Sequence, residues 1–255
     1  MMQIYIESDK TALGKAAAAL GGEAIGVAIR ERGAANIVVA TGASQFETIA
    51  ALVRLDDIDW SRVTAFHLDE YIGMPETHAA SFRRYLKERF TSQVPALGAF
   101  HFIEGDAPDL AGEIERINRL IEEHPIDVTF AGIGENGHLA FNDPPADFEA
   151  AAPFRVVELE RRCRQQQFGE GWFPTLDDVP HEAISMTVAQ IMKSGLVVLA
   201  VPDSRKAQAV RDTLEGPITP MVPASILRRH AACHLFLDPE SAALVQQIPS
   251  TVGEQ

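Results

Sequence analysis

The sequence predicts a single α/β domain: a doubly wound, mostly parallel sheet with helices on both faces, in a modified Rossmann-like arrangement. Short apolar, β-branched runs alternate with helix-periodic segments at a spacing of roughly 25–35 residues, as in successive βαβ units. The 255 residues contain no internal repeat, low-complexity tract or Pro/Gly/Ser-rich linker. One domain over residues 1–255 is therefore expected, with a candidate lid at about 155–185.

Each element has a local signal. The predicted strands are the apolar runs at 3–7, 36–40, 63–68, 100–103, 127–133, 154–159, 195–201 and 233–237. The first helix begins at Asp9 or Thr11 and runs to about Arg32, where Gly33 ends it. Ser81 is a plausible cap for the helix at 81–90. The other predicted helices lie at 45–55, 109–123, 185–192, 205–214, 223–229 and 241–247. Residues 160–183 are polar and weakly periodic, which is the basis for the lid.

Composition limits the function classes. The net charge of −14 disfavours nucleic acid and anionic membranes as partners. A phosphorylated substrate would need a locally positive pocket. The sequence lacks a run of about 18 apolar residues and a signal-peptide pattern at its start, so no membrane span is expected. Cys163 and Cys233 suggest neither a zinc finger nor a disulfide framework, which favours a reducing cytoplasm.

Polar turns follow several predicted strands, and the first is Thr41-Gly42-Ala43-Ser44. The glycine permits a tight turn, and the Thr41 and Ser44 hydroxyls with nearby N–H groups can face an anion at a helix start. The turn matches neither a Walker A nor a GxGxxG pattern, so ATP and NAD are not indicated. The alternative interpretation is plain helix capping.

The strand at 63–68 ends on Asp69-Glu70. Packing does not explain two carboxylates after an apolar strand, whereas the carboxyl edge of a sheet suits a general base. The alternative is a solvated strand end.

The stretch 133–145 carries the densest group of reactive side chains. His138 has Asn136, Asp143 and Glu135 as sequence neighbours. An imidazole beside a carboxylate can take a proton from a hydroxyl while the carboxylate stabilises the imidazolium.

A further turn, Asp203-Ser204-Arg205-Lys206, places cations in a first helical turn, where they oppose the helix dipole. An anionic ligand would explain them, and side chains reaching into solvent is the alternative. Pairs such as His138 with Asp143, or His67 with Asp69, suggest no third metal ligand by spacing. The turns together suit proton transfer on a phosphorylated small molecule.

These residues resemble the glucosamine-6-phosphate deaminase (isomerase) family, whose superfamily includes 6-phosphogluconolactonases. The resemblance covers nearly the whole chain and rests on the motifs Thr41-Gly42-Ala43-Ser44, Phe66-x-x-Asp69-Glu70-Tyr71-x-Gly73, Gly132-x-Gly134-x-x-Gly137-His138-x-Ala140-Phe141-Asn142-x-Pro144 and Ser204-x-Lys206-Ala207. The continuation after His138 favours the deaminase side of the superfamily.

The resemblance implies ring opening of glucosamine 6-phosphate, proton transfer from C2 to C1, and release of ammonia to give fructose 6-phosphate. It implies Asp69 as the base, His138 as the ring-opening group, and Asp143 and Asn136 as its catalytic neighbours. The residues assigned to the substrate and its phosphate are Thr41, Gly42, Ala43, Ser44, Gly137, Arg164 and Lys206. No metal or organic cofactor is implied, and a homo-oligomer is compatible with the resemblance.

The sequence departs from the family pattern at three points. Asn136 stands where the family usually has an aspartate, and Asp143 where it has a glutamate. The lid arginine that contacts phosphate in the family aligns with Gly169, while Arg164 falls on another lid arginine. These departures leave two alternatives open, a lactone hydrolase that uses His138 to activate water and a non-catalytic sugar-phosphate sensor.

Overall fold

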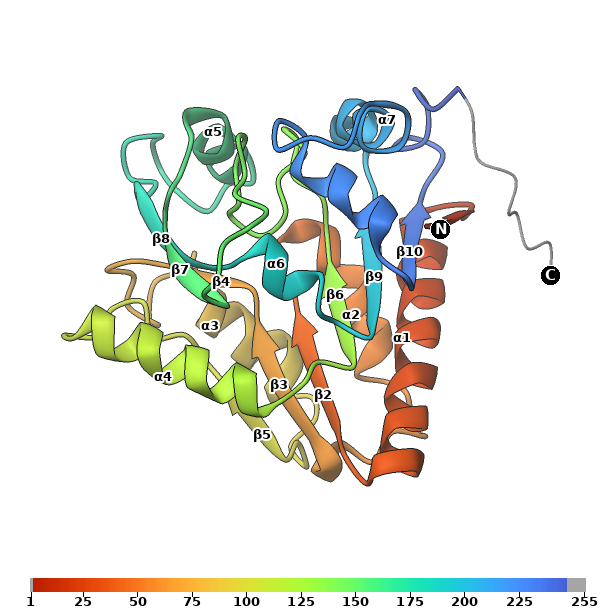
Figure 1. The fold of residues 1–255 in the computed structure, drawn as a ribbon, viewed down its shortest axis with the longest axis vertical. Helices are drawn as coiled ribbons and strands as arrows, with labels where there is room; N and C mark the ends of the chain where they lie inside the picture. Colours follow the sequence, from red (N-terminus) through yellow and green to blue (C-terminus); the bar gives the residue numbers. More distant parts are fainter. Residues whose placement is uncertain (1, 247–255) are drawn as a thin grey trace.

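A parallel sheet of seven strands forms the centre of the computed structural model, which describes residues 2–246 (Figure 1). Its strands are β1 (Gln3–Ile6), β2 (Ala35–Val39), β3 (Val63–His67), β5 (Ala99–His101), β6 (Val128–Ala131), β9 (Leu196–Val201) and β10 (Cys233–Leu237). They are arranged in the order β1-β10-β9-β6-β2-β3-β5, and each neighbouring pair is parallel. The predicted fold class is confirmed.

Helices cover both faces of the sheet because successive strand residues point to opposite sides. Ile37 and Val39 pack into a core with α1 (Lys10–Arg32), α2 (Phe46–Leu52) and α3 (Phe82–Leu86). Val38 packs into the core on the other face. The helices of that face are α4 (Leu110–Glu123), α6 (Val188–Ile191) and α7 (Ala207–Glu215). Both sides of the strands are therefore buried, which explains their continuous apolar runs.

Helix α1 has the length and hydropathy of a membrane span, and within residues 2–246 it is the helix that meets both criteria. Leu13, Ala17 and Ile25 on this helix are fully buried in the core that lies against the sheet. Its apolar character is thus explained by packing. The Asp9 side chain accepts hydrogen bonds from the N–H groups of Thr11 and Ala12, so Asp9 is the cap.

The other helix signals correspond to observed ends. Gly33 adopts a left-handed conformation with φ of 82° at the end of α1. The Ser81 hydroxyl accepts from the Arg84 N–H at the start of α3, whose chain continues through a wider helical turn at Lys87–Thr91. Short 3-10 turns form η1 (Ala43–Gln45), η2 (Trp60–Arg62), η4 (Ser204–Lys206) and η5 (Pro223–Arg229).

A second, antiparallel sheet was not predicted. It contains β4 (Asp69–Tyr71), β7 (Phe154–Glu158) and β8 (Glu182–Met186) in the order β4-β8-β7. The helix predicted at 185–192 is confirmed only as the short α6, and its predicted start is wrong because Ser185 and Met186 belong to β8. The start of this segment is a strand because it pairs with strands distant in the sequence, as Ser185 does with Asp69 and Arg155. Such pairing has no signature in the local sequence pattern.

The excursion between β7 and β8 contains a helix, α5 (Arg161–Gly169). Figure 1 shows α5 (green) and α7 (blue) at the same end of the molecule. A separate apolar cluster, which includes Tyr71, Cys163 and Phe173, anchors the excursion to the second sheet. The predicted last helix is also wrong, because residues 241–244 form turns and Gln247 lies outside the described residues.

The buried ring of His67 gives a prediction for acid stability. Its Nε2 accepts a 2.7 Å hydrogen bond from the Ile103 N–H, which requires a neutral ring, and burial together with nearby Arg83 lowers its pKa to about 3. The unfolded chain binds this proton near pH 6.5, so His67 contributes stability above that pH and loses it as pH falls toward 3. We expect His67→Gln to be less stable than wild type at pH 7 and to show a smaller deficit at pH 5, by up to about 1.4 kcal/mol per pH unit. Urea unfolding at both pH values measures this difference, and a constant deficit would contradict it.

Candidate active site

The site lies where the order of the sheet reverses. From β2 the chain continues to β3 and β5 on one side, then returns to β6 on the other side of β2. Open parallel sheets bind ligands at such a switch point, beyond the carboxyl ends of the strands. Asp69 begins β4 just past the end of β3, and Thr41, His138 and Lys206 follow the adjacent strands β2, β6 and β9. All four side chains line one cavity.

The turn after β2 brings Thr41, Gly42 and Ser44 to the cavity wall. Gly42 has φ of 93°, a conformation that favours glycine. Its carbonyl accepts a 3.0 Å hydrogen bond from the Tyr85 hydroxyl, which fixes the turn against α3. Ala43 faces a neighbouring surface cavity instead.

Asp69 and Glu70 are both buried, so the solvated strand end is excluded for this pair. The Glu70 carboxylate accepts hydrogen bonds from Ser81 Oγ and from several N–H groups around the start of α3, and Arg83 Nε lies 3.5 Å away. Asp69 faces the cavity, and its carboxylate has no hydrogen-bond partner within residues 2–246. Burial, reinforced by the adjacent Glu70, raises the pKa of Asp69 well above its usual range.

Glycines shape the turn that holds His138. A Cβ on Gly134 would lie 2.2 Å from the imidazole, so only glycine leaves room for this ring position. Gly137 has φ of 84° and packs against Val222 outside the cavity lining. The Gly134 N–H donates to the carbonyl of His138 at 3.0 Å and closes the loop.

Asp143 lies beside the His138 ring, with Oδ1 3.2 Å from Nδ1. Burial opposes ionisation of Asp143, but the His138 ring, the Asn136 amide and the Glu160 N–H outweigh it and hold the pKa of Asp143 below its usual value. Asn136 donates to Asp143 Oδ1 at 2.9 Å and accepts from the His138 N–H at 3.1 Å. Asn136 therefore acts on the carboxylate and the loop backbone, and not on the imidazole.

Lys206 and Arg205 diverge from the start of α7. Arg205 is half-exposed and pairs with Asp203 at 2.8 Å and with Glu135 at 3.8 Å. Lys206 is buried, lines the cavity, and has no carboxylate at ion-pair distance within the described part of the chain. Burial lowers the pKa of Lys206, and the nearby Glu170 and Glu135 oppose that shift.

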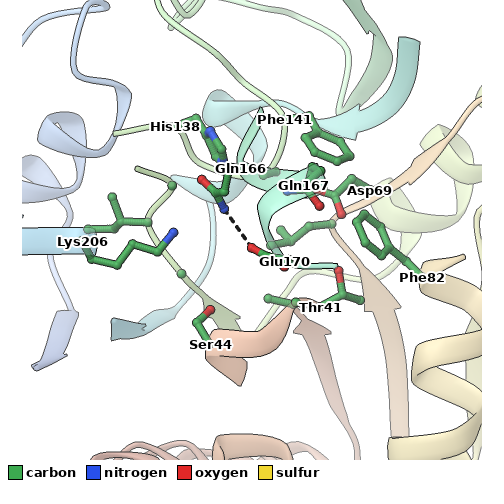
Figure 2. Close-up of a pocket in the computed structure, with 17 residues that line it drawn as sticks. Thr41, Ser44, Asp69, Phe82, His138, Phe141, Gln166, Gln167, Glu170 and Lys206 are labelled. Carbon is green, nitrogen blue, oxygen red and sulfur yellow. Dashed lines mark hydrogen bonds between the residues drawn. The ribbon is translucent and has the colours of Figure 1, made fainter. Parts of the chain in front are cut away.

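Sequence reasoning missed a set of residues that complete the wall: Phe82, Phe141, Gln166, Gln167 and Glu170. Figure 2 shows Asp69 beside the two phenylalanines, Lys206 and Ser44 at the opposite side, and Glu170 between the two groups. Gln166 Nε2 donates to Glu170 Oε1 at 3.1 Å, and Tyr71 donates to Gln167 Oε1 at 2.8 Å. The polar run 165–167 in a weakly periodic segment is the signal that could have identified the glutamines.

The structure does not bring Arg164 to the cavity. Its buried guanidinium donates to the carbonyls of Val179 and Leu176, at 3.0 and 2.8 Å. To contact a phosphate, Arg164 would have to break both hydrogen bonds and leave them unsatisfied in a buried region. It instead holds the loop that follows α5.

The cavity has a volume of about 70 Å³. Small-molecule pockets are typically about 300–1,000 Å³. A second cavity of about 670 Å³ adjoins it and shares Ser44, Glu170 and Lys206 with it. Ser44, Glu170 and Lys206 thus lie where the small reactive chamber meets a larger cavity.

The fold and this chamber are those of an α/β enzyme in which titratable groups line a small polar cavity. A model of the family described as glucosamine-6-phosphate isomerases/6-phosphogluconolactonase matches residues 8–235. The chain is 35% identical over 217 residues to a glucosamine-6-phosphate deaminase of Oenococcus oeni, covering 85% of this chain and 89% of that protein. It is 34% identical over 242 residues to one of Streptococcus equi subsp. equi, covering 95% and 99%.

Solved structures agree with the sequence relatives. A monomeric glucosamine-6-phosphate deaminase superposes with a TM-score of 0.86 at 30% identity, over 95% of this chain and all of that one. A 6-phosphogluconolactonase from Shewanella baltica superposes with a TM-score of 0.78 at 18% identity, over 93% and 97%, which shows the shared fold alone. The chain belongs to the glucosamine-6-phosphate isomerase/6-phosphogluconolactonase family.

Proposed function

We propose that this protein is an isomerising glucosamine-6-phosphate deaminase. The observation that carries the proposal is the unpartnered Asp69 carboxylate, which shares a chamber with the His138–Asp143 pair and with Lys206. The activity of the relatives at about 35% identity supports it. An assay for ammonia and fructose 6-phosphate from glucosamine 6-phosphate tests it directly. Release of acid from 6-phosphogluconolactone without ammonia release, or tight binding without turnover, would reject it.

The chemistry needs one base that shuttles a proton and one group that opens the ring. Asp69 takes the C2 proton and returns it to C1, because its buried carboxylate has a raised pKa and no competing partner. His138 transfers the proton of the ring-opening step, and Asp143 fixes the ring and stabilises its cation. Loss of the C2 amino group as ammonia then leaves the ketose phosphate.

The phosphate binds at the opposite side of the chamber, to Lys206, Ser44, Thr41 and the turn at Gly42. These groups supply the positive charge and hydroxyl donors that a phosphate needs, on a protein whose net charge of −14 would otherwise repel it. Anchoring the phosphate there fixes C2 in reach of Asp69, which is a large part of catalysis.

The part of the candidate lid that contacts the chamber is Glu170, directly after the end of α5. Cys163, Phe173 and Val179 are buried in one apolar cluster, which makes the rest of the excursion costly to move. We propose that Glu170 swings away from Thr41 and Lys206 when the phosphate enters, because two anions cannot share this site. A structure with bound sugar phosphate that leaves Glu170 in place would contradict this motion.

Replacing Lys206 tests the phosphate site. We expect Lys206→Ala to raise KM roughly 30-fold, since a charge-assisted contact contributes about 2 kcal/mol, with a smaller fall in kcat. Arg205→Ala is the matched control: it removes an adjacent cation already paired with Asp203, and its KM should stay within about twofold of wild type. Equal KM effects for the two variants would contradict the assignment.

The acidic composition and the cavity lining also support a proposal for the compartment, the partners and the assembly of the enzyme. We propose a cytoplasmic enzyme with a small phosphorylated amino sugar as its partner, and no nucleic acid or membrane, consistent with the acidic surface. We propose that one subunit suffices for catalysis, because Asp69, His138 and Lys206 of the same chain line one cavity. Size-exclusion chromatography with light scattering measures the assembly, and activity confined to an oligomeric fraction would contradict a self-sufficient subunit.

A further inference from the structure

A buried cluster of metal-binding side chains lies directly behind the catalytic histidine. Asp143 and Cys163 join His138 there, and their ligand atoms all lie within 4.8 Å of one another. Sequence spacing indicates no third ligand for His138 and Asp143, but α5 brings the Cys163 thiol beside them. An imidazole, a carboxylate and a thiol are a donor set that zinc and other thiophilic divalent cations prefer over magnesium or calcium.

The ligand atoms have spare bonding capacity. Nδ1 of His138 is buried and has no aligned hydrogen-bond partner within residues 2–246, although Asp143 Oδ1 lies 3.2 Å away. The Asp143 carboxylate accepts one hydrogen bond at each oxygen, from Asn136 and from the Glu160 N–H, which leaves lone pairs on both. A cation would replace the poorly aligned contact between His138 Nδ1 and Asp143 Oδ1 as the partner of the imidazole nitrogen.

Charge and access also favour a cation. Burial, and then the negative charges of Asp143, Asp69 and Glu160, raise the pKa of the Cys163 thiol, and the same negative charges attract a cation. Asp143 lines a separate surface cavity of about 490 Å³, and His138 lines the reactive chamber, so an ion can approach without crossing the sheet. Zinc bonds of about 2.0–2.3 Å require the ligand atoms to close by roughly 1 Å, within reach of side-chain rotation.

We propose that His138 Nδ1, the Asp143 carboxylate and Cys163 Sγ form a binding site for zinc or a similar thiophilic divalent cation, and that occupancy inhibits the enzyme. On binding, the Cys163 thiol releases its proton to water as the sulfur–metal bond forms, and nothing is oxidised or reduced. The ion removes Asp143 from His138 and fixes the ring. The inhibitory part rests on the proposed function, because it assumes that His138 acts in catalysis.

The site does not include the phosphate-binding groups. Lys206, Ser44 and Thr41 line the chamber, whereas Asp143 and Cys163 do not. Zinc should therefore lower kcat while KM for the sugar phosphate changes by less than about twofold. This pattern separates the site from simple competition at the phosphate.

Metal binding is measured first without any substrate, on protein carrying no histidine tag. Equilibrium dialysis should give one tightly bound zinc per chain, and cobalt should give a sulfur-to-cobalt charge-transfer band. Cys163→Ser and Cys163→Ala should abolish the band and weaken zinc binding roughly 100-fold or more, since losing a ligand exceeds the effect of losing a supporting contact. Cys233→Ser is the matched control, a second buried cysteine on β10, and should keep both signals.

Inhibition is then tested on the same proteins. Zinc should inhibit wild type and Cys233→Ser, and both Cys163 variants should be resistant while keeping most of the activity. A zinc-induced rise in Tm in wild type but not in the folded Cys163 variants gives a readout independent of turnover. Absence of the cobalt band, or full binding and inhibition in the Cys163 variants, would overturn the site. Stoichiometric binding without inhibition would overturn the inhibitory role, and an inactive wild type that binds zinc would reject the proposed function alone.

Discussion

Replacing Asp69 by asparagine should lower kcat by about 10³-fold, in the middle of the range of about 10²–10⁴-fold for loss of a general base. Asparagine has the same shape but cannot accept the C2 proton. Because burial and Glu70 raise the pKa of Asp69, the acid limb of the wild-type kcat profile should lie above the ordinary carboxyl range. Activity falls as pH drops through that pKa, since the base must be ionised. Steady-state assays across pH measure both effects.

The residual activity of Asp69→Asn should lack this acid limb. Its affinity for the sugar phosphate should stay close to wild type, because Lys206 and Ser44 hold the phosphate at the other side of the chamber. Isothermal titration of the folded variant provides the control. A variant that keeps more than a tenth of wild-type kcat would show that another group carries the proton.

Replacing His138 by glutamine should lower kcat by roughly 10²–10³-fold through slow ring opening. Glutamine fits the space that Gly134 leaves open, but it can neither take up nor release the proton, and Asp143 has no cation to stabilise. Kinetics with substrate deuterated at C2 distinguish this defect from loss of the base.

In His138→Gln, ring opening limits the rate, so the deuterium isotope effect on kcat should fall toward one. In Asp69→Asn, proton transfer limits the rate, and the isotope effect should be at least as large as in wild type. Asp143→Asn should resemble His138→Gln with a smaller loss, since the ring remains present but poorly oriented. An isotope effect that grows in His138→Gln would move His138 to the proton-transfer step.

Much of the fold follows from local patterns. The β-branched runs and the caps at Asp9, Ser81 and Gly33 identify strands and helices because their physical causes lie within a few residues. The second sheet could not be predicted, since β4 is three residues long and is specified by pairing with β8, more than 100 residues later. Pairing between strands that are far apart in the sequence leaves no signature in a short stretch of residues.

Local patterns are enough to predict the parallel sheet and the polar turns that follow its strands, because apolar periodicity and turn chemistry act over a few residues. Which of these side chains are available for chemistry depends on how the chain folds. The tertiary structure assigns Glu70 to the start of α3 and leaves Asp69 free, it ties Arg164 to loop carbonyls, and it brings Glu170 between the two ends of the chamber. It also places Cys163 behind His138. Hydrogen-bond partners and burial depend on contacts between distant segments, and those contacts exist only after the chain has folded.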